Sequence, residues 1–348
     1  MKTDESRFER ILVIRFHLIG DVLLVTPLLE ALRRRFPDSH IAMLTDSPAS
    51  EVIKGHPAVN ELIVYSSKAG KSRLTLTDLA EGLRALRLIR RRRFDLVINL
   101  HPGWRGAIAA LFSGAACRVG YDRHRKTNSY YNVLVPYHPG KRYRVDYLMD
   151  TLRAIGLDAE AGPPSMHISD EDREFVRPYV EDGDGPIVAV HPGRPQTRKN
   201  WMTDRFAAVA DALASKYGAR VIFVGAPAES ERVDQIMGAM QQPSLSLAGK
   251  LSLKQLGALL ERSDLFIGID SAPLHIASAV GTPTVALFGF SDPVEWNPPG
   301  ARHIVIHKPL PDHPCNPPHC CEVDDSPCMR NILVEDVLEA ADRLLALG

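Results

Sequence analysis

The chain has 348 residues, of which 45% are hydrophobic and 24% are charged, and its formal net charge is zero. This composition is typical of a soluble globular protein, and the length favours two domains over one. A neutral chain whose basic runs lack interleaved aromatic residues is not expected to bind nucleic acid. No apolar run is long enough to cross a bilayer, and the N-terminal segment lacks the core of a secretion signal, so we expect a cytoplasmic protein.

Strands and helices alternate through the first half of the chain. The run ILVIRF at 11–16, apolar except where Arg15 interrupts it, predicts a buried strand, and the spacing after it predicts a helix that stops at Pro37. Further strands are expected at 40–46, 61–66 and 95–100, with a helix at 76–94. This order predicts a parallel sheet covered by helices on both faces.

A segment rich in proline, glycine and acidic residues, 157–186, separates this half from a second half of the same design. A short helix is expected within it at 169–180. The alternation then restarts, with strands in IVAVHPG, RVIFVGAP, LFIGIDSAP and TPTVALFG and with a helix closed by Gly218. We therefore predict an N-terminal domain at 1–168 and a C-terminal domain at 169–335. Two such domains facing each other are expected to enclose a cleft, with ligands beyond the carboxyl ends of the strands.

One loop of the second half combines a strand end with the start of a helix. It places Asp270 after a buried strand, Ser271 as the expected cap of a helix that begins near Pro273, and His275 on the first turn. The free N–H groups and the dipole of such a helix end attract an anion. The alternative interpretation is a capped helix with a surface histidine.

Two further loops also follow predicted strands of the second half. HPGRPQTRKNW carries Arg194, Arg198 and Lys199, which suit phosphate oxygens, although a solvated basic loop is the alternative. In GAPAESER, Glu229 suits either a ribose hydroxyl or simply a helix N-terminus. A P-loop motif is absent and no G-x-G-x-x-G follows the first strand, which disfavours a P-loop ATPase or a nicotinamide enzyme.

Four of the five cysteines lie close together near the end of the chain, at Cys315, Cys320, Cys321 and Cys328. Their spacing lacks paired C-x-x-C knuckles, so a reduced structural loop is favoured over a zinc site, and a disulfide after oxidation is a third option. The basic runs 33–35, 90–93 and 141–144 are typical of solvated helix faces. They would also suit an anionic lipid surface or a phosphorylated substrate.

Taken together, these motifs resemble glycosyltransferase family nine, the lipopolysaccharide heptosyltransferases. The resemblance rests on RFHLIGDVLLVTPLLEAL, FDLVINLHPGWRGAIAALFSGAACRVGY, HPGRPQTRKNWMTDRFAAVADAL, FVGAPAESE and LFIGIDSAPLHIASAVGTPTVALFG, and it spans nearly the whole chain. The first two motifs are most similar to the branch that adds the third, side-branch heptose, although HPGW at 101–104 departs from that branch in a region expected near the acceptor. The resemblance implies an α/β protein of the GT-B fold, two Rossmann-like doubly wound domains facing a central cleft. It also implies a C-terminal helix, 336–348, that can pack back on the N-terminal domain.

The family's activity is transfer of L-glycero-D-manno-heptose from ADP-heptose to a lipid A–core acceptor, with inversion at the anomeric carbon. The resemblance implies that Asp21, directly after Gly20 and near the cleft, is the general base; the alternative is that Asp21 caps the first helix. Peripheral contact with the inner membrane is a further implication.

Donor contacts are also implied by position. Lys199 would neutralise the diphosphate, Glu229 would contact the ribose, and the donor loop would comprise Asp270, Ser271, Ala272 and His275. Arg194 is expected near the cleft, and relatives that add the first heptose often carry a Thr-Thr pair where this chain has Gly193 and Arg194. No cofactor and no metal are expected, since the lysine and a helix N-terminus take the metal's place.

Other functions fit parts of the same sequence. A relative could move another nucleotide sugar onto a different surface glycan with the same base and diphosphate site. A non-catalytic sugar-nucleotide binder would not need Asp21. A two-domain sugar-nucleotide epimerase would need acids and histidines from both domains.

Overall fold

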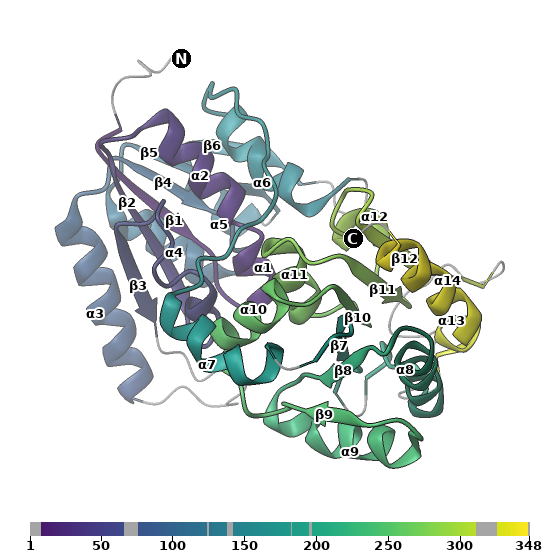
Figure 1. Cartoon of the computed structure of the whole chain (residues 1–348). Helices are drawn as coiled ribbons and strands as arrows, with labels where there is room; N and C mark the ends of the chain where they lie inside the picture. The colour runs from purple at the N-terminus through teal and green to yellow at the C-terminus, as the bar shows by residue number, and fades with distance from the viewer. Residues whose placement is uncertain are drawn as a thin grey trace. The chain divides into compact units, whose positions relative to one another are not determined.

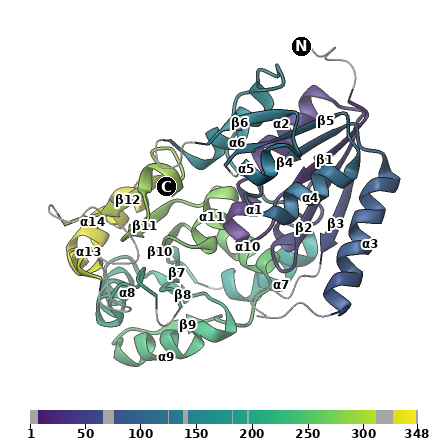
Figure 2. The ribbon, with the colours of Figure 1, turned by 180° about the vertical axis from the view of Figure 1, so that it is seen from behind.

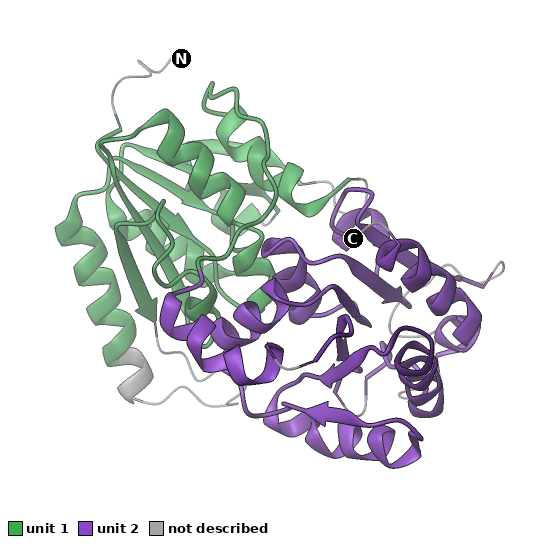
Figure 3. Cartoon of the chain, viewed as in Figure 1, with its two compact units in different colours: residues 1–167 green, residues 168–348 purple. Residues whose placement is uncertain are grey.

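The computed structural model of the chain describes residues 8–65, 76–123, 125–137, 142–181, 183–194, 197–310 and 326–346. The chain divides into two compact units, residues 1–167 and 168–348 (Figure 3). Each unit contains a six-stranded sheet in which all the neighbouring strands run parallel.

The sheet of unit 1 has the strand order β3-β2-β1-β4-β5-β6 (Figure 1). Its strands are β1 Arg10–Ile14, β2 His40–Asp46, β3 Glu61–Tyr65, β4 Leu96–Asn99, β5 Cys117–Asp122 and β6 Val133–Pro136. β1 lies in the middle, between β2 and β4, and its residues 11–14 are fully buried. Because helices cover both faces at this position, residues 11–14 are all apolar instead of alternating with polar residues.

Helices cover the two faces of this sheet in pairs. α2 Thr26–Arg35 packs with α6 Arg144–Arg153, and α3 Leu76–Arg92 packs with α4 Trp104–Ser113. Figure 2 shows α3 and α4 side by side over the strands. Leu12 and Ile14 of β1 join the core beneath α3 and α4. The short elements of the unit are α1 Ile19–Leu23, α5 Arg125–Asn128 and the 3-10 turn Ala49–Val52.

Unit 2 repeats the design with the strand order β12-β11-β10-β7-β8-β9. Its strands are β7 Ile187–His191, β8 Arg220–Phe223, β9 Ser244–Ser246, β10 Leu265–Ile269, β11 Thr284–Phe288 and β12 His303–His307. Its helices are α7 Asp170–Val180, α8 Thr203–Tyr217, α9 Ser230–Ala239, α10 Leu253–Glu261, α11 Ala272–Ala279, α12 Pro293–Trp296, α13 Pro327–Arg330 and α14 Val334–Leu345, with a 3-10 turn at Pro227–Glu229. The loops that follow β1, β7 and β10 carry the site residues predicted from the sequence.

Local signals in the sequence explain where several helices begin and end. The N-cap of α7 is Ser169, whose hydroxyl accepts from the Asp172 N–H while the Asp172 carboxylate accepts from the Ser169 N–H. The C-cap of α8 is Gly218, which adopts the left-handed backbone that favours glycine. The last helix, which the resemblance allowed to return to the first domain, packs against α8 and β10–β12, and Val337 and Ala341 are part of the unit 2 core.

Candidate active site

The acid that follows β1 is held by an arginine from the same strand end. Asp21 lies inside α1 and is 9% exposed, and its Oδ1 is 2.5 Å from Arg15 Nη2. Arg15 Nη1 in turn donates to the carbonyl oxygen of Leu100, just beyond β4, at 2.5 Å. A buried carboxylate needs such a partner, because an uncompensated charge at this depth would be strongly destabilising. Asp21 does not cap the first helix, since the N-cap position belongs to Leu18.

The turn between β1 and α1 has an unusual backbone. His17 and Leu18 have φ of 57° and 50°, a region that costs residues other than glycine roughly 1–3 kcal/mol each. Asp46, at the end of β2, holds the turn: its carboxylate accepts from the His17 N–H at 3.0 Å and lies 2.5 Å from His17 Nδ1. The sequence did not single out Asp46 or Arg15, yet these two residues fix the turn that presents Asp21.

A second histidine, His101, packs at the same edge of the sheet. Its ring lies edge-on to Phe16 at 5.2 Å and to His17 at 5.7 Å between centroids. Burial, and then repulsion from Arg15 and His17, lower the pKa of His101 from 6.5 to about 4. At neutral pH this ring is therefore uncharged and adds no further positive charge beside the Arg15–Asp21 pair.

The low pKa of His101 predicts a loss of stability in mild acid. The folded state binds a proton to His101 less readily than the unfolded state, so the stabilisation is complete above pH 6.5 and is lost as the pH falls toward 4. We expect His101→Phe, which keeps a ring and removes the titration, to reduce the stability lost between pH 7 and pH 5 by on the order of 2 kcal/mol. Urea unfolding at the two pH values measures this difference, and equal losses in both proteins would contradict it.

In unit 2, the predicted diphosphate lysine is bound to the predicted donor loop. Lys199 Nζ lies 2.5 Å from Asp270 Oδ2 and donates to the Asp270 carbonyl oxygen at 3.1 Å. Burial alone would raise the pKa of Asp270, but attraction to Lys199 and His275, with hydrogen bonds from Lys199 and Ser291, lowers it below its usual range. The pair therefore places a cation directly before the first turn of α11.

The structure corrects two sequence interpretations of this loop. Ser271 occupies the N-cap position of α11, but its side chain does not cap the helix. Its hydroxyl donates instead to the carbonyl oxygen of Ile269 at 3.1 Å and lies 3.0 Å from His191 Nδ1. His275 is buried, with Nε2 3.9 Å from Asp270 Oδ1, so the surface-histidine interpretation is wrong. Ala272 is the first residue of α11.

His191, at the end of β7, connects the loops that follow β8 and β10. Its Nε2 lies 3.2 Å from Glu229 Oε2, which also accepts from the Ala226 N–H at 2.6 Å. Burial alone would raise the pKa of Glu229, but the hydrogen bond and attraction to His191, with the Ala226 bond and Arg194, lower it. Glu229 therefore carries a negative charge at neutral pH, and one of its two oxygens is already committed to the protein. The sequence missed His191, although it stands in the HPG motif.

The turn that leads to Lys199 depends on a glycine. Gly193 has φ of 87°, and a Cβ there would lie 2.4 Å from Ile269 Cδ1 and 2.9 Å from Asn200 Oδ1. A larger side chain would force the turn away from β10. Arg194, next to it, is exposed.

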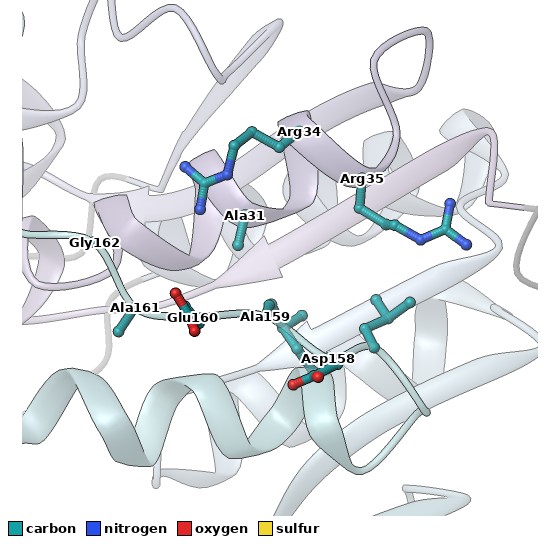
Figure 4. Close-up of a pocket in the computed structure, with 10 residues that line it drawn as sticks. Ala31, Arg34, Arg35, Asp158, Ala159, Glu160, Ala161 and Gly162 are labelled. Carbon is teal, nitrogen blue, oxygen red and sulfur yellow. The ribbon is translucent and has the colours of Figure 1, made fainter.

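A pocket of about 570 Å³ lies elsewhere in unit 1 (Figure 4). Arg34 and Arg35 extend from α2 on one side, and the segment 158–162 forms the other side. α2 runs back from the end of β1 toward the start of β2, so its last turn lies near the amino ends of the strands. The pocket therefore contains none of the predicted site residues.

The predicted cysteine cluster lies mostly outside the described residues. Cys328 is buried in the unit 2 core, while Cys315, Cys320 and Cys321 are not described. Within the described ranges, no three His, Cys, Asp or Glu side chains gather so that they could hold a metal ion.

A family model, glycosyltransferase family 9 (heptosyltransferase), matches residues 83–323. The chain belongs to glycosyltransferase family 9. It is similar to lipopolysaccharide heptosyltransferase 3 of Escherichia coli, with 31% identity over 293 residues that cover 82% of this chain and 84% of the relative. The enzyme is thus a glycosyltransferase of the lipopolysaccharide-core heptosyltransferase family, as the motifs predicted. The alternatives of a non-catalytic binder and of an epimerase are not supported.

Solved structures of family 9 share the architecture of both units. The family 9 glycosyltransferase from Veillonella parvula DSM 2008 has a TM-score of 0.86 and 27% identity, and the match covers 100% of both chains. The structure of E. coli heptosyltransferase WaaC with ADP-2-deoxy-2-fluoro heptose has a TM-score of 0.73 at 16% identity, covering 96% of this chain and 99% of that chain, and shows the fold alone. The predicted GT-B fold is confirmed.

Proposed function

We propose that this family 9 enzyme transfers L-glycero-D-manno-heptose from ADP-heptose to the inner core of lipopolysaccharide, with inversion at the anomeric carbon. The observation that carries the proposal is Asp21, a buried carboxylate whose charge Arg15 compensates at the end of β1. A carboxylate serves as a general base when the acceptor hydroxyl comes within hydrogen-bonding reach of it. The relative that is 31% identical carries the name heptosyltransferase 3, which supports a side-branch heptose as the sugar added.

The reaction assigns Asp21 the role of general base. The acceptor hydroxyl gives its proton to the Asp21 carboxylate as its oxygen attacks the anomeric carbon of the heptose. The bond from that carbon to the diphosphate breaks on the opposite side, and ADP leaves with the bonding electron pair. Negative charge therefore grows on the diphosphate, and the main electrostatic need of the reaction is a cation or a set of N–H donors aimed at it.

The edge of the unit 2 sheet meets that need with two groups. Lys199 stands beside Asp270, and α11 begins directly afterwards at Ala272, so its first N–H groups face the same region as the Lys199 ammonium. Asp270 holds Lys199 in place before the donor arrives. In this proposal the Gly193–Arg194 turn and Gly20 shape the surroundings of the reacting groups, and no metal or cofactor takes part.

Glu229 is proposed to bind the ribose of the donor with its second carboxylate oxygen. We expect Glu229→Ala to raise KM for ADP-heptose by about tenfold or more with little change in kcat, since a ribose contact is the same in the ground state and the transition state. Glu229→Gln, which keeps an oxygen for the Ala226 N–H, is the matched control for loop structure and should have a smaller effect. Initial rates over a range of donor concentrations test this, and an unchanged KM in the alanine variant would sink the ribose role.

The proposed acceptor is a lipid A–core glycolipid, and the proposed location is the cytoplasmic side of the inner membrane, in peripheral contact with it. No helix in the described ranges is long and apolar enough to cross a membrane.

A second candidate keeps the same base and diphosphate site but uses another nucleotide sugar for a different surface glycan. Calorimetric titration with ADP, UDP and GDP, each alone and as a sugar conjugate, separates the two. The proposal predicts the tightest binding for ADP-heptose, whereas a preference for a uridine or guanosine conjugate would favour the second candidate.

A further inference from the structure

α4 turns its bulky apolar side chains toward solvent. Trp104, Leu111 and Phe112 are 57%, 40% and 55% exposed. At 100° per residue these three and Ile108 fall on one stripe of the helix. The opposite stripe, which faces the sheet, consists of small residues: Gly106, Ala107, Ala109, Ala110 and Ser113. An ordinary surface helix has the reverse arrangement, so this apolar stripe is a candidate interaction surface.

The neighbouring helix gives this surface a strong positive charge. α3 packs along α4 (Figure 2). Arg90 Nη1 donates to the Ser113 carbonyl oxygen at 3.3 Å where α4 ends. Arg84, Arg87 and Arg91 are exposed on α3. Residues 81–92 and 104–113 together contain six arginines and one glutamate, Glu81, and one of the arginines, Arg92, is paired with Glu61 of β3 at 2.7 Å.

We propose that this α3–α4 surface, formed by the apolar stripe of α4 and the exposed arginines of α3, lies on an anionic lipid bilayer. Trp104 and Phe112 would enter the headgroup region, and the arginines would meet the lipid phosphates. Both features are needed, because one weak apolar anchor binds a membrane only marginally without a polybasic patch. A second copy of the chain is a poor occupant, since two such basic surfaces repel each other. The inference rests on the proposed function only in giving a lipid-linked acceptor as the reason for docking.

Sedimentation with vesicles tests the surface without any sugar transfer. Full-length protein is mixed with vesicles of phosphatidylcholine alone or of phosphatidylcholine with phosphatidylglycerol, at low and high salt. We expect at least tenfold tighter binding to the anionic vesicles, weakened by salt. Leu111→Ser with Phe112→Ser should lower that affinity at least tenfold. Arg87→Glu with Arg91→Glu should lower it by about fivefold or more for each arginine.

The matched control is Phe175→Ser, which removes a 44% exposed aromatic side chain from α7 in unit 2 and should leave vesicle binding unchanged. Thermal unfolding confirms that each variant is folded. Equal binding to neutral and anionic vesicles, or an effect of Phe175→Ser as large as that of the α4 variant, would overturn the proposal. The proposal would also be overturned if the protein bound no vesicles and instead formed a dimer that the α4 substitutions dissociate.

An activity assay on a delipidated, water-soluble core oligosaccharide separates this inference from the proposed function. The α4 variant should transfer sugar to that acceptor at the wild-type rate, and a parallel loss there would show that the stripe serves the reaction itself, against docking. If the wild-type protein transfers no heptose to any core acceptor, the proposed function fails, while vesicle binding still reports on the surface.

Discussion

Replacing Asp21 by asparagine is expected to lower kcat by about a hundredfold to ten-thousandfold, because the amide keeps the shape of the carboxylate but takes no proton. ADP binding should change by less than about twofold, since every proposed donor contact lies in unit 2. Stopped-time assays of heptose transfer and calorimetry with ADP measure the two quantities in the same preparation. The separation of rate from binding is what distinguishes a base from a residue that shapes the donor site.

The asparagine variant also leaves Arg15 with a neutral neighbour, so its stability must be measured alongside. Some loss is expected, because Arg15 is buried and its ion pair with Asp21 is removed. Asp38→Asn, at an exposed position of unit 1, is the matched control and should keep both rate and stability. A folded Asp21→Asn enzyme with more than about a tenth of the wild-type rate would contradict the assignment of the base.

Replacing Lys199 by methionine is expected to lower kcat by about a hundredfold to a thousandfold and to weaken ADP binding as well. The ammonium is proposed to stabilise charge that grows on the leaving diphosphate, and part of that charge is already present in bound ADP. Lys250→Met, which removes an exposed lysine of the same unit, should have no effect. A full rate in Lys199→Met would exclude this electrostatic role.

The Lys199 variant needs a second control, because it leaves the buried Asp270 carboxylate without its cation. Because the pKa of Asp270 is lowered in the folded protein, its ionised carboxylate stabilises the fold at neutral pH. That contribution is lost only when the pH falls below the usual pKa of an aspartate. Removing Lys199 should move that loss to higher pH. Combining Lys199→Met with Asp270→Asn removes the stranded charge and should restore stability without restoring kcat. If it restored both, Lys199 would be acting through structure.

The sequence predicted the parts of the fold that rest on local patterns. Runs such as 11–14 and 265–269 contain no polar side chain because both faces of a central parallel strand are buried. The short strands β5, β6, β9 and β12 were missed, since their partly exposed residues leave no long apolar run. Gly218 correctly predicted the end of α8, because a helix end of this kind needs only one residue with a left-handed backbone, which glycine adopts readily.

The candidate site was harder to predict, because its contacts join residues far apart in the chain. Arg15 looked like an interruption of an apolar strand, and its carbonyl partner, Leu100, lies 85 residues away. Ser271 was expected to cap its helix by a local rule. His191, 80 residues earlier in the chain, instead lies within hydrogen-bonding distance of the hydroxyl. A spacing rule gives the loop on which a polar residue lies but not the partner that its side chain finds.

The most direct test of the proposed reaction is mass spectrometry of a truncated core glycolipid after incubation with ADP-heptose and either the wild-type enzyme or Asp21→Asn. We expect one added heptose with the wild-type enzyme, with the inverted anomeric configuration, and almost none with the folded variant. No addition by the wild-type enzyme, or equal addition by both proteins, would contradict it.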